Sequence, residues 1–65
     1  MKITTEVLAK MAQQAIAAHD HFHDSQSDAS YLAMYRALDL FSMAFRGDVS
    51  DEATKAIDKW GSDNA

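Results

Sequence analysis

The sequence predicts an all-α domain of three helices, and both its composition and the spacing of its apolar residues favour this fold. Proline is absent and glycine occurs only at Gly47 and Gly61, so the residues that most disfavour helix are rare. Apolar residues recur at steps of three and four, the spacing that lines one face of an α-helix. The 65 residues suffice for one domain, which we place at 1–65.

The first helix is predicted over about residues 5–22. Thr4 or Thr5 suits the N-cap position, where a hydroxyl accepts an otherwise unpaired backbone N–H. Polar residues 24–28 follow and predict a loop, with Ser27 or Asp28 as the next N-cap. The apolar stripe of this helix is formed by Leu8, Met11, Ala15, Ala18 and Phe22, and Val7, Ala12 and Ile16 widen it.

The second helix is predicted over about residues 28–46 and the third over about 51–60. Gly47 directly follows the second helix, in the position where a left-handed residue commonly ends a helix. Ser50 is suited to cap the third helix, and Gly61 is expected to end it. Because the turn between these two helices is short, they should pack as neighbours.

The central second helix is unusually apolar for so short a chain. Its strongly polar residues from position 31 onward are Arg36, Asp39, Ser42 and Arg46, which share one side at the helical period. One interpretation is that the first and third helices cover this wide face, as the core of a three-helix domain requires. The other is that the third helix, which is short and has a narrow apolar stripe, leaves part of it uncovered. We expect part of the face to remain for an interface.

This interface is expected to bind a second copy of the chain, as a helical homodimer, or another protein. Monomers rarely expose large contiguous apolar patches, and a symmetric homodimer is the commonest way to cover one. Small domains are often reinforced by disulfides or association, and this chain has no cysteine. The expected interface residues, some of which must also serve the core, are Tyr31, Met34, Tyr35, Leu38, Phe41 and Phe45.

The histidine cluster at residues 19–23 gives an alternative. His19 and His23 are one helical turn apart, and two imidazoles at that spacing can share a divalent metal. A structural zinc site needs about four ligands, and this segment does not supply the rest. We therefore predict no metal site and keep both histidines as weak candidates. They also leave open a metal- or pH-responsive helical module.

Composition argues against several other functions. There is no cysteine, no G-x-S-x-G turn and no glycine-rich phosphate loop, so we expect neither an enzyme nor a cofactor. The net charge of −4 disfavours direct nucleic-acid binding. No run approaches the roughly 20 apolar residues that span a bilayer, and nothing resembles a signal peptide. We expect no membrane contact and a cytoplasmic location.

The sequence thus predicts a small non-catalytic interaction module that self-associates or binds a protein partner. Its size and acidity are also compatible with a compact acidic inhibitor, for example a phage-encoded protein that blocks a host defence or nucleic-acid-handling enzyme by protein contact. No residue pattern selects between these two.

Overall fold

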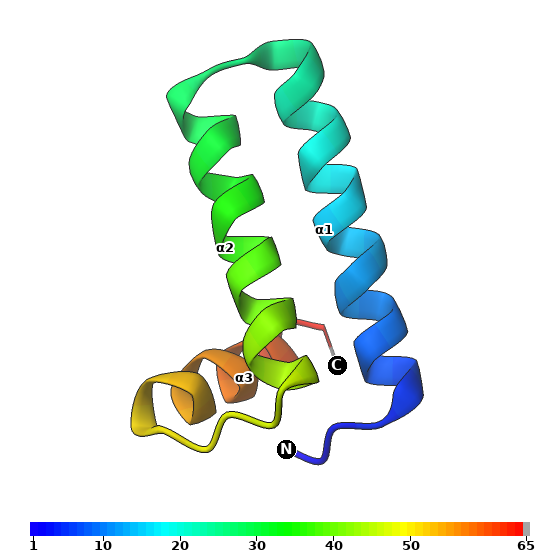
Figure 1. Ribbon diagram of the computed structural model, residues 1–65, viewed down its shortest axis with the longest axis vertical. Coiled ribbons are helices and arrows are strands. Elements are labelled where there is room, and N and C mark those ends of the chain that lie inside the picture. Colours follow the sequence, from blue (N-terminus) through cyan, green and yellow to red (C-terminus); the bar gives the residue numbers. More distant parts are fainter. Residues whose placement is uncertain (65) are drawn as a thin grey trace.

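The computed structural model describes residues 1–64, which form three α-helices: α1 (Thr5–Ser25), α2 (Asp28–Phe45) and α3 (Asp51–Asp63). Helices α1 and α2 form an antiparallel hairpin, and α3 runs across its open end, away from the α1–α2 connection (Figure 1). The described residues contain no strand. The all-α, three-helix prediction is therefore confirmed.

Each helix begins where a local hydroxyl caps it. The N-caps are Thr4, Ser27 and Ser50, and each side chain accepts the backbone N–H three residues later at 3.1–3.2 Å. Since such a cap depends on adjacent residues alone, the sequence was sufficient to predict all three starts.

Helix α1 ends at Ser25, so the prediction that it ends near residue 22 and gives way to a loop from residue 24 was wrong. The left-handed residue that ends it is Gln26, with φ of 49°, whose N–H donates to the Phe22 carbonyl at 2.7 Å. The last turn remains helical because Phe22 packs edge-on against Tyr31 at 5.5 Å. The Ser25 and Ser30 hydroxyls also meet at 2.5 Å across the connection.

Helix α2 ends at Phe45, one position before the predicted limit. Arg46 is its C-cap, and Gly47 follows with φ of +69°, the left-handed conformation expected of it. The glycine adopts this conformation without the steric cost that a Cβ would bring.

Gly61 does not end α3, which continues to Asp63, so this prediction was wrong. A Cβ at Gly61 would lie 2.5 Å from Sδ of Met1, so here the glycine leaves room for the Met1 side chain. The helix ends instead where the backbone N–H and the side-chain amide of Asn64 both donate to the Trp60 carbonyl, at 3.0 and 2.8 Å.

The core lies where α3 meets the hairpin. Met11, Ala44 and Ile57 form its centre, one from each helix. Helix α3 packs on α2 and reaches α1 through side chains, since Trp60 Nε1 donates to Gln14 Oε1 at 2.7 Å. The other half of the hairpin, toward the α1–α2 connection, has no cover from α3 (Figure 1).

The α2–α3 turn depends on the ionised form of Asp48. Its carboxylate accepts the Ser50 backbone N–H at 2.9 Å and pairs with the Arg46 guanidinium at 3.1 Å. The hydrogen bonds from Ser50, and then the contact with Arg46, lower the pKa of Asp48 below its usual 3.8. A carboxyl with a lowered folded-state pKa stabilises the fold above its unfolded pKa and loses that contribution as pH falls through the folded value.

We therefore expect Asp48→Asn to lower the urea midpoint near neutral pH and to have a smaller effect at about pH 2.5, because more of the Asp48 carboxyl is protonated there and less of its charge contributes to stability. Urea unfolding followed by circular dichroism at the two pH values measures this. A deficit of equal size at both would contradict a role for the charge.

Candidate interaction surface

Five apolar residues form a continuous stripe on α2, which we call the α2 seam. Their steps alternate between three and four residues, the pattern that keeps side chains on one helix face and that coiled coils use to pack against a partner helix. The α2 seam consists of Tyr31, Met34, Leu38, Phe41 and Phe45, and Tyr35 borders it. These are the six residues predicted as an interface from the sequence.

Most of the α2 seam is exposed. Tyr31 is 51% exposed, Leu38 45% and Phe45 70%, and the bordering Tyr35 is 56% exposed. Large apolar side chains at these levels retain much of their surface in water, so the protomer core does not require their full burial.

The remaining two residues of the stripe are half-buried. Phe41 packs against the core cluster and also lies 5.7 Å from the Phe45 ring, so it joins the core to the exposed surface. Met34 is intermediate in exposure. The structure thus divides the predicted set into residues that face solvent and residues that are shared with the core.

The position of α3 explains why the stripe is uncovered. Leu40 and Met43 lie on the side of α2 that faces α3, where they line a groove together with Trp60. At the helical period the α2 seam falls on the opposite side of α2 from Met43 and Leu40. Helix α3 therefore covers one flank of the hairpin and leaves the other open.

Helix α1 adds a residue to this open flank. Lys10 and Gln14 face α3, because Lys10 Nζ lies over the Trp60 ring, 5.9 Å from its centroid, and Gln14 Oε1 accepts the Trp60 hydrogen bond. Ile16 lies on the other edge of α1 and is 63% exposed. The expectation that Ile16 widens the core stripe was wrong: its side chain is exposed, on the edge of α1 away from α3.

The candidate metal ligands do not converge. The His19 and His23 side chains are 62% and 80% exposed, and each ring lies near the acid that follows it, with Nδ1 at 3.6 Å from Asp20 and 3.8 Å from Asp24. Within residues 1–64 no three metal-ligating side chains are grouped together. The site therefore offers two imidazoles without a third protein ligand.

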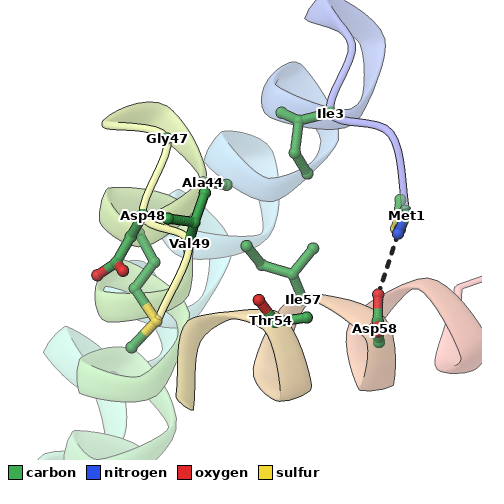
Figure 2. A pocket seen from close by; sticks show the side chains of 10 residues that line it. Met1, Ile3, Ala44, Gly47, Asp48, Val49, Thr54, Ile57 and Asp58 are labelled. Carbon is green, nitrogen blue, oxygen red and sulfur yellow. Dashed lines mark hydrogen bonds and ion pairs between the residues drawn. The ribbon is translucent and has the colours of Figure 1, made fainter. Parts of the chain in front are cut away.

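The hollow beside the α2–α3 turn is small. It has a volume of about 200 Å³ and is lined by residues that include Ile3, Val49 and Ile57 (Figure 2). At its edge the Met1 amine pairs with the Asp58 carboxylate at 3.1 Å (Figure 2). Small-molecule sites usually have about 300–1,000 Å³, so this hollow is below the common range.

Comparisons of the chain with protein-family models, with curated proteins and with solved structures found no significant match. Within the part of the chain that the structure describes, every helix is too short or too polar to cross a membrane. The function is therefore inferred from the residues of this chain alone.

We expect saturating zinc to leave the melting temperature unchanged, because two exposed imidazoles bind too weakly to shift the folding equilibrium appreciably. Differential scanning fluorimetry with and without zinc measures this. A rise in melting temperature that disappears in the His19→Ala/His23→Ala variant would contradict the prediction and restore the metal site.

Proposed function

We propose that this chain is a non-catalytic protein–protein interaction module, and that the α2 seam together with Ile16 binds a second copy of the chain. The observation that carries the proposal is an uncovered stripe of large apolar side chains at coiled-coil spacing on a protomer whose core lies elsewhere.

The exposed area approaches what a stable dimer needs. An aromatic side chain can bury about 150–250 Å², so the exposed parts of Tyr31, Tyr35 and Phe45 offer roughly 350 Å² per protomer. A standard interface takes about 800 Å² from each partner. The three rings supply close to half, and Leu38, Ile16 and the half-buried Met34 and Phe41 add to it.

The chemistry of the surface suits a copy of itself. The α2 seam has no ionisable carboxylate, ammonium or guanidinium group, so pairing two of them leaves no buried charge without a partner. Aromatic residues and methionine are enriched in the buried centres of interfaces. A twofold dimer places the same patch against itself, so the patch has to be complementary to itself, and an apolar stripe without these charged groups meets that condition.

Self-association would also stabilise the half of the hairpin near the α1–α2 connection, which α3 does not cover. Away from α3, the hairpin is joined by Ala15, the Phe22–Tyr31 contact and a serine network around the buried Ser30. A 65-residue domain buries little apolar surface. A dimer would bury more apolar surface in the half of the hairpin that α3 does not cover.

Two leucines on α2 give a matched test. Leu38 lies in the α2 seam and Leu32 lies off it, and both are 45% exposed. Leu38→Glu would place two carboxylates opposite each other in the interface, so we expect it to weaken self-association by at least about 100-fold. Leu32→Glu makes the same chemical change outside the interface, and we expect an effect of only about two- to threefold.

Sedimentation equilibrium over a range of concentrations measures both dissociation constants, and circular dichroism verifies that both variants remain helical. Equal dissociation constants for the two folded variants would contradict the assignment of the interface to the α2 seam.

A further inference from the structure

We infer that the two copies pair antiparallel, with the twofold axis at Leu38, so that Tyr31 of one chain faces the partner's Phe45. This inference rests on the proposed self-association and adds its orientation. Leu38 is the midpoint of the α2 seam, because Tyr31 and Phe45 lie seven residues before and after it. A half-turn about Leu38 therefore places apolar residues opposite apolar residues along the whole stripe.

The charges at the closed end of the hairpin oppose a parallel pairing. No lysine or arginine occurs between Lys10 and Arg36. In that interval Asp20, Asp24 and Asp28 gather around the α1–α2 connection, and all three are exposed. A parallel dimer would bring both sets of carboxylates to the same end without a lysine or arginine from that segment to neutralise them, and like charges placed together cost binding energy.

An antiparallel dimer separates the two acidic ends. The seam spans fourteen residue steps from Tyr31 to Phe45, which corresponds to about 21 Å at 1.5 Å per residue. This exceeds the Debye length of about 8 Å at physiological ionic strength, so the repulsion between the ends is largely screened.

The helix dipoles favour the same orientation. In an antiparallel pair the positive N-terminus of each α2 lies beside the negative C-terminus of the other, whereas a parallel pair places like ends together. This contribution and the carboxylate repulsion therefore act in the same direction.

The hairpin places Ile16 where it supports the axis. The Phe22–Tyr31 contact fixes the two helices at the same height near the connection. Ile16 lies six residues before Phe22 on α1, and Leu38 lies seven residues after Tyr31 on α2. These intervals correspond to similar rises of about 9 and 10.5 Å, so Ile16 is nearly level with Leu38. The centre of the dimer would then contain Leu38 and Ile16 from both chains, in a core built from four helices.

Single-cysteine variants test the orientation, since the chain has no cysteine of its own. Leu38→Cys and Phe45→Cys replace side chains that are exposed in the protomer. Tyr31→Cys also removes the ring contact with Phe22, so circular dichroism first verifies that this variant is as helical as the other two. A disulfide needs Cα atoms about 4.4–6.8 Å apart, so only facing positions should link. Arg36→Cys, on the opposite side of α2, is the control that should not link.

Under mild oxidation we expect a mixture of the Tyr31→Cys and Phe45→Cys chains to form the mixed disulfide at least about tenfold more than either self-disulfide, because only the facing pair has a high effective concentration. Leu38→Cys should link to itself in either orientation and so reports on the interface alone. Mass spectrometry of the unreduced products distinguishes mixed from self-disulfides.

Two other outcomes separate the orientation from the proposed function. Self-disulfides of Tyr31→Cys and of Phe45→Cys without the mixed product would overturn the antiparallel pairing and support a parallel dimer through the same seam. No disulfide at Leu38→Cys beyond the Arg36→Cys level, from a protein of monomeric mass, would overturn the self-association and this inference with it.

Discussion

A helix of 13 residues has to cover a hairpin whose helices have 21 and 18 residues, and this mismatch shapes the molecule. Helix α3 runs across the open end and covers one flank, where Ala53 is completely buried and Ile57 joins the core. The other flank receives no cover from within the chain. The exposed α2 seam follows from this division, since apolar residues lie on both sides of α2 but only one side has a partner helix.

The two ends of the hairpin are held by different forces. At the open end, apolar burial around Met11 joins three helices, and hydrogen bonds from Trp60 to Gln14 and from Gln14 to Asn64 fix α3 against α1. At the closed end, Ser30 is buried and its hydroxyl bonds to Ser25 and Ser27, so polar contacts replace much of the apolar core. All buried side-chain polar atoms in residues 1–64 have partners, which avoids the cost of unpaired groups.

Local chemistry determined which features the sequence could predict. The three helix starts were predictable because a capping hydroxyl interacts with its own neighbours, as at Ser50. The ends of α1 and α3 were not, because distant contacts accompany both: Phe22 packs on Tyr31 near the end of α1, and the Asn64 that caps α3 also accepts a hydrogen bond from Gln14. The candidate surface shows the same limit. The periodicity of α2 identified its apolar residues. Which of them are exposed to solvent and which also pack in the core depends on the position of α3.

The central claim is that the α2 seam of one protomer is covered by that of another, and the molar mass in solution tests it most directly. Light scattering coupled to size-exclusion chromatography, repeated over a wide dilution series, should give twice the 7.2 kDa chain mass at high concentration and fall toward one chain as the protein is diluted. A mass that stays at 7.2 kDa at millimolar protein concentration would contradict the account, because a dissociation constant above about 1 mM is too weak to count as specific association.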